Sequence, residues 1–505
     1  MKLADLLSAV EVRAVHGPLD RPVRSVSHDS REVGPGDIFV AIAGGQADGR
    51  RFAPQLPCAA VVCEGPVETL PGVTRIDVPD ARLALAALAS ALHGAPARRL
   101  PVVGITGTNG KTTTTFLVEA IAAAAGWSSL RIGTTGHRLA GRDLPAAHTT
   151  PEAPLLHALL ARAIEEGCAV GLMEVSSIGL SQRRVDHLPF QVAAFTSFSQ
   201  DHLDFHGTME AYLAAKWRLF TELMREDGVA VLNFDDPAIA AHPPIPGRLI
   251  SYGRAEGLSL RIDADARCDL DGCRATVHSP AGPLALFTPL LGAHNLENAV
   301  CALGVALALG LPPAVALEGL AACRAVPGRL ERVPGTADQP VVLVDYAHSP
   351  DALERSLGTV RALGATSVHV VFGCGGDRDR GKRPLMGAIA ERLADRVTLT
   401  SDNPRSEDPD AILAEIAAGL LRPEAAARTI DRAAAITAAI AEAGPGDVIL
   451  IAGKGHETTQ TIGARTLPFD DRAVAADALR AAALRAAARR TPTLGTPVPD
   501  RQGAP

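Results

Sequence analysis

Aromatic residues are scarce in this 505-residue sequence, where Phe, Trp and Tyr together make up only 3% of the chain. Proteins that hold single-stranded nucleic acid stack the bases on such side chains. Long runs of Lys and Arg, which would attract a phosphate backbone, are also missing, and the formal net charge is −7. The composition therefore predicts that nucleic acid is not a partner.

Clustered cysteines and long apolar runs are missing too. The eight cysteines are scattered singly, without a CxxC pair or a compact framework, so we expect reduced thiols. The first ten residues carry Asp5 and no extended apolar core, which argues against a signal peptide. The longest apolar run, 299–311, is about 13 residues and too short for a bilayer, so it predicts a buried helix. We expect a cytoplasmic globular protein without a membrane span.

The stretch 102–114 is the most informative part of the sequence. An apolar run, Val102 to Thr106, leads into a glycine-containing loop, and an alanine-rich amphipathic segment, Phe116 to Ala125, follows. This order predicts strand, loop and helix. Ile105 stands where the strict phosphate-loop pattern G-x-x-x-x-G-K-[ST] has its first glycine, so the match is incomplete.

The residue types of this loop nevertheless suit a phosphate. Gly107 and Gly110 would let backbone N–H groups approach phosphate oxygens, and the following helix would present its N-terminal dipole. Lys111 would supply a cation, and the hydroxyl of Thr112 could bind Mg²⁺. An ordinary turn is the alternative, and the flanking strand and helix favour nucleotide binding.

Three α/β domains are expected from the length and from the pattern of apolar runs. The first, 1–98, is a small α/β module with strands at 38–42 and 59–63 and a helix at 81–93. The second, 99–326, alternates strands and helices as a mostly parallel sheet covered on both faces does. The third, 327–488, has parallel strands at 341–345, 368–372 and 448–452. A disordered tail, 489–505, is predicted from its Pro, Thr, Gly and Arg content.

Polar residues follow several predicted strands, where ligands of parallel sheets bind. Glu174 and Ser176 end one strand, and the run 201–206 holds two Asp and two His residues that could contact a metal or substrate. A structural role is the alternative for such histidines. Lys216 lies in a helical pattern and by default would be a solvated surface lysine. Gly373-Cys374-Gly375-Gly376 does not continue to G-x-G-x-x-G, so a dinucleotide site is not predicted there.

Nine motifs carry a family resemblance. They are GTNGKTT at 107–113, EVSS at 174–177, DHLDFHG at 201–207, AHNLENA at 293–299, PGRLE at 327–331, DYAHSPD at 345–351, GCGGDRDRGKR at 373–383, DNPRSE at 402–407 and GKGHE at 453–457. In this order they resemble the Mur ligases over about residues 20–475. The pattern is most similar to the branch of the family that adds meso-2,6-diaminopimelate to UDP-N-acetylmuramoyl-L-alanyl-D-glutamate.

The resemblance implies a fold and a reaction. It implies a uridine-binding N-terminal α/β module, a central ATP-binding domain and a Rossmann-like C-terminal domain that binds the amino acid. ATP would phosphorylate the D-glutamate carboxylate of the UDP-linked dipeptide, and the amine of diaminopimelate would displace phosphate from the acyl phosphate, with Mg²⁺ as cofactor. Positioning and cations that neutralise phosphoryl charge would supply most of the catalysis. The protein would act as a monomer in peptidoglycan precursor synthesis.

The resemblance also implies roles for individual residues. Catalytic residues would be Lys111, Glu174, His202 and Lys216, and metal ligands would be Thr112, Glu174, His202 and Lys216, the last as a carbamate (N6-carboxylysine). ATP would contact Gly107, Thr108, Asn109, Gly110, Lys111, Thr112, Thr113, Asn295, Arg329, Asp345 and His348. The UDP precursor would contact Ser30, Gln46, Ala47, Thr149, Thr150, Ser176, Gln182 and Arg184. Diaminopimelate would contact Arg378, Asp402, Asn403, Pro404, Arg405, Gly453 and Glu457.

Two positions depart from the family pattern, and alternatives remain at this stage. Ile178 stands where many Mur ligases have His, and His28 stands where an apolar residue is common beside uracil. A lysine-adding Mur ligase and a folylpolyglutamate synthase are the nearest alternatives, and the N-terminal loops and the DNPR motif argue against both. A P-loop switch or motor would explain 104–114 but not the Arg and Glu residues of the last domain.

Overall fold

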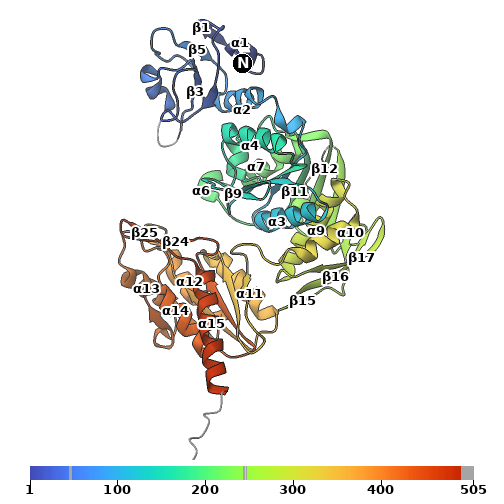
Figure 1. Ribbon diagram of the computed structural model, residues 1–505, viewed down its shortest axis with the longest axis vertical. Helices are drawn as coiled ribbons and strands as arrows, with labels where there is room; N and C mark the ends of the chain where they lie inside the picture. The colour runs from blue at the N-terminus through green and yellow to red at the C-terminus, as the bar shows by residue number, and fades with distance from the viewer. Residues whose placement is uncertain (45–47, 243–244, 246, 491–505) are drawn as a thin grey trace, which may run out of the picture. The chain divides into compact units, whose positions relative to one another are not determined.

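The computed structural model describes residues 1–44, 48–242, 245 and 247–490. The chain forms two compact units, Met1–Arg324 and a second that begins at Ala325, and each is described by itself. Figure 1 shows helices packed beside the larger sheets, as expected for α/β domains. Within the described residues, no helix is long and apolar enough to span a membrane.

The first sheet of unit 1 has the strand order β1-β5-β4-β3-β2. All pairs are parallel except β1 with β5. Alternate residues of β3 pack on opposite faces: Ile38 and Val40 join the core beneath α2, whereas Phe39 joins the core beside η1. The elements are α1 (Leu3–Leu7), β1 (Ala14–His16), β2 (Ser25–Ser27), β3 (Asp37–Ala41), η1 (Gly49–Gln55), β4 (Ala60–Cys63), β5 (Thr74–Asp77) and α2 (Ala81–Leu92).

The second sheet of unit 1 has 12 strands, in the order β15-β16-β14-β13-β12-β11-β6-β10-β7-β8-β9, and β17 pairs with β16. Its centre, from β14 to β7, is parallel, which confirms the predicted mostly parallel sheet. The parallel strands are β6 (Val102–Thr106), β7 (Ser129–Ile132), β10 (Val170–Glu174), β11 (Phe190–Phe195), β12 (Met224–Asn233), β13 (Arg248–Gly253) and β14 (Leu260–Ile262). The antiparallel edges are β8 (His137–Leu139), β9 (Arg142–Leu144), β15 (Arg267–Asp269), β16 (Gly272–Ser279) and β17 (Gly282–Thr288).

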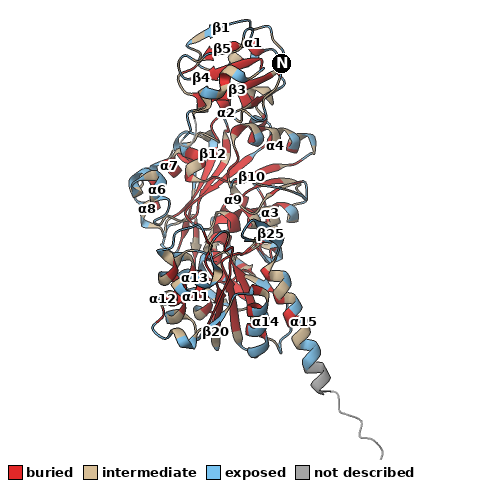
Figure 2. Cartoon of the chain, turned by 90° about the vertical axis from the view of Figure 1, so that its left-hand side faces the viewer, coloured by how far each residue is buried: buried red, intermediate tan, exposed pale blue. Residues whose placement is uncertain are grey.

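Helices cover this sheet, and their burial follows their sequence patterns (Figure 2). The helix after the phosphate loop begins at Lys111, earlier than predicted, because Gly110 adopts a left-handed N-cap conformation with φ 86°. The apolar run 299–311 falls largely in the buried helix α9, as predicted. The helices are η2 (Pro96–Arg98), α3 (Lys111–Ala124), α4 (Ala153–Glu165), α5 (Ser177–Ser181), α6 (Leu203–His206), α7 (Met209–Thr221), α8 (Pro237–Ala240), α9 (Ala293–Ala308) and α10 (Pro313–Ala322).

Unit 2 contains a sheet of order β18-β19-β23-β20-β21-β22 and a separate hairpin, β24-β25. Only β18 is antiparallel to its neighbour in the larger sheet. Helix α15 runs to Arg490, two residues into the predicted disordered tail, and 491–505 lie outside the described residues. The elements are β18 (Glu331–Val333), β19 (Val341–Asp345), α11 (Pro350–Ala362), β20 (Ser367–Phe372), α12 (Lys382–Leu393), β21 (Arg396–Thr400), α13 (Pro409–Ala417), η3 (Pro423–Ala425), β22 (Ala427–Thr429), α14 (Arg432–Glu442), β23 (Asp447–Ala452), β24 (Thr459–Ile462), β25 (Arg465–Pro468) and α15 (Asp471–Arg490).

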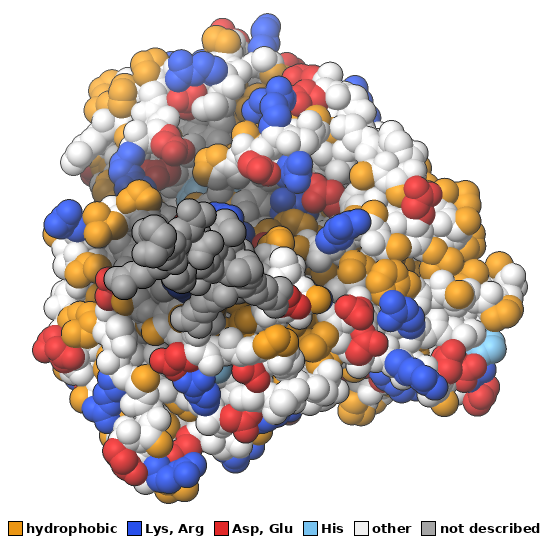
Figure 3. All heavy atoms as spheres, turned by 60° about the horizontal axis from the view of Figure 1, so that its bottom comes forward, with side chains coloured by type: hydrophobic (Ala, Val, Ile, Leu, Met, Phe, Trp, Pro, Cys, Tyr) orange, Lys and Arg blue, Asp and Glu red, His pale blue; other side chains and the backbone are white. Residues whose placement is uncertain are grey.

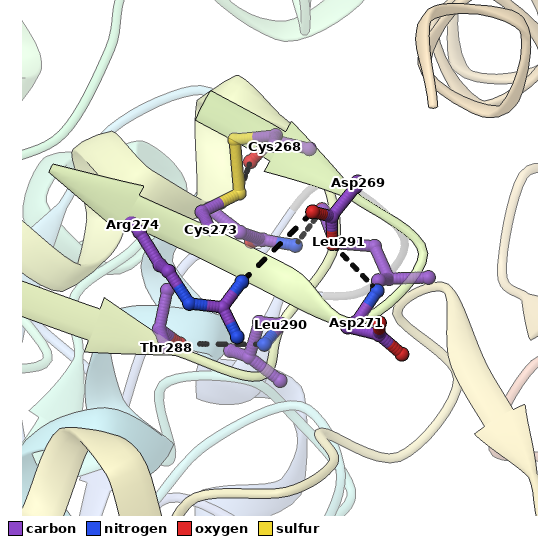
Figure 4. Close-up of a disulfide and its surroundings, with 10 residues drawn as sticks. Cys268, Asp269, Asp271, Cys273, Arg274, Thr288, Leu290 and Leu291 are labelled. Carbon is purple, nitrogen blue, oxygen red and sulfur yellow. Dashed lines mark hydrogen bonds and ion pairs between the residues drawn. A yellow bond between two sulfur atoms is a disulfide. The ribbon is translucent and has the colours of Figure 1, made fainter. Parts of the chain in front are cut away.

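One disulfide corrects the expectation that all cysteines are reduced. Cys268 of β15 and Cys273 of β16 are direct partners across the antiparallel pair, with Cα atoms 4.2 Å apart, and their sulfurs are bonded (Figure 4). Spacing in sequence gave no sign of the tight hairpin that brings them together. The other six cysteines are free and buried. On the face drawn in Figure 3, acidic and basic side chains are interspersed.

Candidate functional site

In the loop between β6 and α3, two positions have room only for glycine. A Cβ on Gly107, whose φ is +150°, would lie 2.0 Å from Thr196 Oγ1, and a Cβ on Gly110 would lie 2.3 Å from Asn298 Oδ1. Lys111 folds over the loop, and its Nζ donates to the carbonyls of Gly107 and Thr108 at 2.8 and 3.0 Å. The loop therefore places a cation and the N-terminus of a 14-residue helix at one point, which suits an anion.

Glu174 lies beside this loop because β10 pairs in parallel with β6. Its carboxylate is buried and accepts hydrogen bonds from the hydroxyls of Thr112 and Thr134, at 2.8 and 3.0 Å. The backbone N–H of Thr134 donates to the other carboxylate oxygen at 2.9 Å. Thr134 was missed in the sequence, although the strand-end rule that drew attention to Glu174 also points to the Gly-Thr-Thr run after β7.

Three residues predicted for the UDP precursor lie directly against Glu174. The hydroxyl of Thr149 is 3.0 Å from that of Thr134, and the hydroxyl of Thr150 donates to the Glu174 carbonyl at 2.9 Å. Ser176 donates its backbone N–H to Thr150 Oγ1 at 2.9 Å. The structure thus brings together residues that are far apart in sequence, at the carboxyl end of β10.

Arg184 extends this cluster. Its Nη1 donates to the carbonyl of Thr150 at 2.9 Å, and its Nη2 donates to Gln182 Oε1 at 2.7 Å. An ion pair of 2.8 Å joins its Nε to Glu152, a residue that the sequence reasoning did not single out. Ile178, one of the two departures from the family pattern, lies in the short helix α5 of the same region.

Lys216 is buried, so the default interpretation of a solvated surface lysine is wrong. Its side chain points inward from α7, only 1% of the residue is exposed, and Nζ donates to the Gly107 carbonyl at 2.9 Å. Burial and then the charge of Lys111 hold the pKa of Lys216 well below its ordinary value, because both oppose a second cation there. The amine is therefore suited to remain neutral, which is the form that reacts with an electrophile.

Tyr212 connects Lys216 to its surroundings and was also missed. It lies four residues before Lys216, on the same face of α7, and its ring centroid is 4.6 Å from Lys216 Nζ. Its hydroxyl is 3.2 Å from Thr108 Oγ1, and its ring is 6.0 Å from that of His202. Tyr212 therefore lies between the phosphate loop and the Asp/His segment.

That segment, 201–206, is mostly exposed. His202 has a left-handed backbone, φ 51°, and its Nε2 is 3.6 Å from Asp201 Oδ2. His206 instead contacts the Ser177 hydroxyl at 2.9 Å. In the described part of the chain, no group of three or more His, Cys, Asp or Glu residues is placed to hold a metal ion.

Of the residues predicted at the uridine end, Ser30 follows β2 and is partly buried. His28, the second departure from the family pattern, is exposed two residues before it. Gln46 and Ala47 lie outside the described residues, so their predicted roles remain predictions.

Asn295 is the predicted nucleotide residue of α9 in unit 1. Its Nδ2 donates to the Leu291 carbonyl at 2.8 Å, and its Oδ1 accepts from Asn298 Nδ2 at 3.0 Å. Asn298 Oδ1 is the atom that excludes a side chain at Gly110. This amide pair therefore connects the first turn of α9 to the phosphate loop.

The predicted nucleotide residues of unit 2 surround the end of β19. Asp345 accepts from the Leu330 N–H at 2.7 Å and from the Ser356 hydroxyl at 2.9 Å, and burial raises the pKa of its carboxyl. The Arg329 guanidinium lies 5.4 Å from the centroid of the Tyr346 ring, and His348 Nδ1 is 2.8 Å from the Tyr346 carbonyl.

Two further loops of unit 2 hold the residues predicted to bind the amino acid. Arg405 has φ 51°, its backbone N–H donates to the Thr461 carbonyl at 3.1 Å, and its Nη1 donates to the Gly376 carbonyl at 2.7 Å. Pro404 before it is buried, whereas Arg378 is exposed. These backbone contacts with the β24 region hold the loop after β21 in one conformation.

Lys454 joins the loop after β23 to the loop after β21. It is fully buried, and its Nζ donates to Glu457 Oε2 at 2.9 Å and to Asn403 Oδ1 at 3.2 Å. Asn403 Nδ2 donates to the same Glu457 oxygen at 2.9 Å. A Cβ on Gly453 would lie 2.6 Å from Asp402 Oδ2, and burial raises the pKa of Asp402. Asn403 and Glu457 therefore form one polar cluster with Lys454, beside the close approach of Asp402 to Gly453.

Comparisons with known proteins agree with this organisation. Three family models match the chain: the Mur ligase family, catalytic domain at 22–93, the Mur ligase middle domain at 105–306, and the Mur ligase, glutamate ligase domain at 328–455. An enzyme of Synechococcus elongatus named UDP-N-acetylmuramoyl-L-alanyl-D-glutamate–2,6-diaminopimelate ligase is 43% identical over 495 residues, which cover 95% of this chain and 99% of that enzyme. The enzyme of the same name from Parasynechococcus marenigrum is 45% identical over 491 residues, 94% of this chain and 98% of its own.

Solved structures show the same likeness. A structure of UDP-N-acetylmuramoyl-L-alanyl-D-glutamate–2,6-diaminopimelate ligase has a TM-score of 0.69 at 34% identity and covers 95% of this chain and 99% of its own. The MurF ligase from Thermotoga maritima in complex with ADP shares the fold at 20% identity, with a TM-score of 0.59 over 93% of this chain and 99% of its own. With family models, full-length relatives and fold in agreement, this chain belongs to the Mur ligase family.

Proposed function

We propose that this protein is the ATP-dependent ligase that adds meso-2,6-diaminopimelate to the D-glutamate of UDP-N-acetylmuramoyl-L-alanyl-D-glutamate. Relatives that carry this activity in their names are 42 to 45% identical over 94 to 95% of the chain. The reaction belongs to peptidoglycan precursor synthesis, and we place it in the cytoplasm, with a monomeric enzyme.

The observation that carries the proposal is the position of Glu174. Its carboxylate bonds Thr112 of the phosphate loop, while its carbonyl bonds Thr150, which in turn contacts Ser176. One buried residue therefore joins the place where ATP phosphates would bind to the place where the acceptor carboxylate would bind. A ligase needs this adjacency, because the γ-phosphoryl group must pass between the two substrates.

The reaction needs two steps because the D-glutamate carboxylate is a weak electrophile. A carboxylate resists attack by an amine, so one of its oxygens first attacks the γ-phosphorus of ATP, and the bond from that phosphorus to the β,γ-bridging oxygen breaks to release ADP. The amine then attacks the carbonyl carbon of the acyl phosphate, the C–O bond to phosphate breaks, and the amine loses a proton. Lys111 and the α3 N-terminus offset the negative charge on the phosphoryl oxygens during transfer.

The residues around Glu174 fit a magnesium ion. A carboxylate oxygen and the Thr112 hydroxyl are 2.8 Å apart in a buried position, and Mg²⁺ prefers oxygen ligands. Thr112 and Glu174 would hold one ion, and His202 with a carboxylated Lys216 would serve a second. Bound Mg²⁺ would neutralise phosphate charge and lower the cost of bringing two anionic substrates together.

Lys216 has the properties that carboxylation requires. Its neutral Nζ would attack the carbon of CO₂ and lose one proton, which leaves an N-carboxylate and converts a cation into an oxygen ligand. The neighbouring Lys111 favours this product, because its ammonium attracts an anion at that point and would repel a second cation.

Arg405 is the residue we assign to amino-acid specificity. Diaminopimelate differs from lysine by a second carboxylate at its far end, and a guanidinium can bind a carboxylate with two parallel hydrogen bonds. The backbone contacts of Arg405 and its bond to Gly376 hold this group in place. Lysine would leave a cation of the site without its anion, so the site would reject it.

The test is a competition reaction analysed by mass spectrometry. The protein, MgATP and the UDP-dipeptide are incubated with equal concentrations of diaminopimelate and lysine, and phosphate release is followed in parallel. The expected product is the diaminopimelate tripeptide, with phosphate release that requires both the UDP-dipeptide and an amino acid. A lysine tripeptide in equal amount would reject the specificity, and phosphate release from ATP alone would favour a switch or motor over a ligase.

A further inference from the structure

Arg432 forms a fully buried ion pair in unit 2, and the reaction described above does not use it. It is the first residue of α14, and Asp471 is the first residue of α15. Both side chains are 0% exposed, and Arg432 binds the Asp471 carboxylate with two parallel hydrogen bonds, each 2.7 Å. A pair so deeply buried costs desolvation energy, which offsets much of what it contributes to stability.

The same guanidinium also binds two backbone carbonyls. Its Nη1 donates to the Ser401 carbonyl at 3.3 Å, and its Nη2 donates to the Ala452 carbonyl at 3.0 Å. Ser401 follows β21, and Ala452 is the last residue of β23. In the sheet, β20 lies between these two strands, so they are not hydrogen-bonded neighbours. Arg432 therefore bridges the ends of two strands that the sheet itself does not join.

The two carbonyls stand immediately before the loops assigned to the amino acid. Asp402 to Arg405 follow Ser401, and Gly453 to Glu457 follow Ala452. The loops then meet through Lys454, Asn403 and Glu457. A planar guanidinium held by a carboxylate is rigid, so it fixes the separation of the two carbonyls and with it the starting points of both loops.

We propose that Arg432, oriented by Asp471, is a positioning residue for amino-acid recognition, because it fixes the spacing between the loop of Arg405 and the loop of Glu457. The inference rests on the proposed ligase function. Diaminopimelate presents an ammonium and a carboxylate on one carbon at its far end. The anionic Glu457 of one loop and the cationic Arg405 of the other must therefore lie at a set distance from each other. A shift of about 1 Å in such a site can cost about 10²-fold in rate.

The experiment compares Arg432→Met with Arg361→Met in the full-length enzyme. Arg361 also binds a carboxylate and a carbonyl, Asp395 at 2.8 Å and the Leu393 carbonyl at 2.7 Å, but these lie before β21, at the opposite end of that strand. For each variant, the KM values for diaminopimelate, ATP and UDP-dipeptide, kcat, and the melting temperature are measured. We expect Arg432→Met to raise the KM for diaminopimelate by about tenfold or more and leave the other two KM values within about twofold.

Three further variants separate positioning from stability. Arg432→Met leaves the buried Asp471 carboxylate unpaired and is expected to lower the melting temperature, whereas Arg432→Met with Asp471→Leu removes both charges and should regain stability. If the double variant regains stability but keeps the raised KM for diaminopimelate, positioning is supported. Arg432→Lys and Asp471→Asn, which keep part of the contacts, should give intermediate KM values and serve as the test if the single Met variant does not fold.

Three results would overturn the inference. They are an unchanged KM for diaminopimelate in a folded Arg432 variant, an equal rise of all three KM values in that variant, and the same rise of the KM for diaminopimelate in Arg361→Met. A wild-type enzyme that adds no diaminopimelate would instead reject the proposed function, so the two failures are distinguishable.

Discussion

Replacing Arg405 by Ala tests the assignment of amino-acid specificity most directly. The substitution removes a guanidinium whose Nη1 donates to the Gly376 carbonyl at 2.7 Å, and it leaves the backbone contacts with the β24 region available. Ala is preferred to Gly because residue 405 has φ 51°, and Gly would relax that left-handed backbone and change the loop as well. The loss is then confined to the guanidinium, that is, to its bond with the Gly376 carbonyl and its interaction with the ligand.

The magnitude follows from the hydrogen bonds that a carboxylate would lose. Two bonds between charged groups contribute about 1.5 to 3 kcal/mol each, so the substitution should cost about 3 kcal/mol or more. Because about 1.4 kcal/mol corresponds to a tenfold change, kcat/KM for diaminopimelate should fall by about 100-fold or more. The KM values for ATP and UDP-dipeptide should change little, and lysine should become a relatively better substrate.

The assay is initial-rate phosphate release at varied diaminopimelate, repeated with lysine. Arg380→Ala is the matched control, because Arg380 lies near the same loops but its exposed side chain is engaged by Glu415. The control should retain the wild-type KM for diaminopimelate and its preference over lysine. An Arg405→Ala enzyme that keeps the full preference for diaminopimelate would refute the role given to this guanidinium.

Four other outcomes are expected. Lys111→Met should lose ligation by at least about 10³-fold with an unchanged circular dichroism spectrum, because a phosphate-binding cation is lost from a loop built mostly of backbone; near-normal turnover would contradict the ATP site. Lys216→Ala should be nearly inactive and regain activity with added short carboxylates, and intact-mass spectra of the wild type under CO₂ should show a carboxylated lysine; the absence of both the rescue and the adduct would exclude the ligand role. Burial, then the charges of His93 and His187, lowers the pKa of His157 from 6.5 to about 3. The unfolded chain therefore takes up that proton first as the pH falls below 6.5, and the stability of unit 1 should drop by about 2 kcal/mol between pH 8 and pH 5 through this group. His157→Leu should lose that part of the pH dependence in urea titrations, and an unchanged slope would contradict the shift. Thiol counting after unfolding without reductant should find six free cysteines, and eight would contradict the Cys268–Cys273 disulfide.

Much of the fold was predictable from local patterns. Runs of β-branched and apolar residues predicted the strands at 341–345 and 448–452 to within one residue, because a fully buried parallel strand must be apolar on both faces. The start of α3 was placed too late, since its first turn is Lys and four Thr residues that carry no apolar period. Its position was instead set by the left-handed Gly110.

The order of the motifs identified the family, and with it most of the residues in the candidate site. Thr149, Thr150, Ser176 and Arg184 were named from the resemblance, and the structure brings them together around the end of β10. Their functions in binding remain predictions. The resemblance alone gave no reason for their proximity, which comes from the parallel pairing of β10 with β6 and β7.

Which polar side chains are buried, and what they contact, became known from the folded structure. The local pattern around Lys216 predicts a surface lysine, and Lys454 was not singled out in the sequence, yet each is enclosed by elements from distant parts of its unit. The same holds for Arg432 and for the Cys268–Cys273 pair, whose partners lie on other strands or helices. The strands, the phosphate loop and the family could be predicted from the residues alone, because these depend on local spacing. Burial and partner choice depend on how the strands are ordered, and that order is a property of the folded chain.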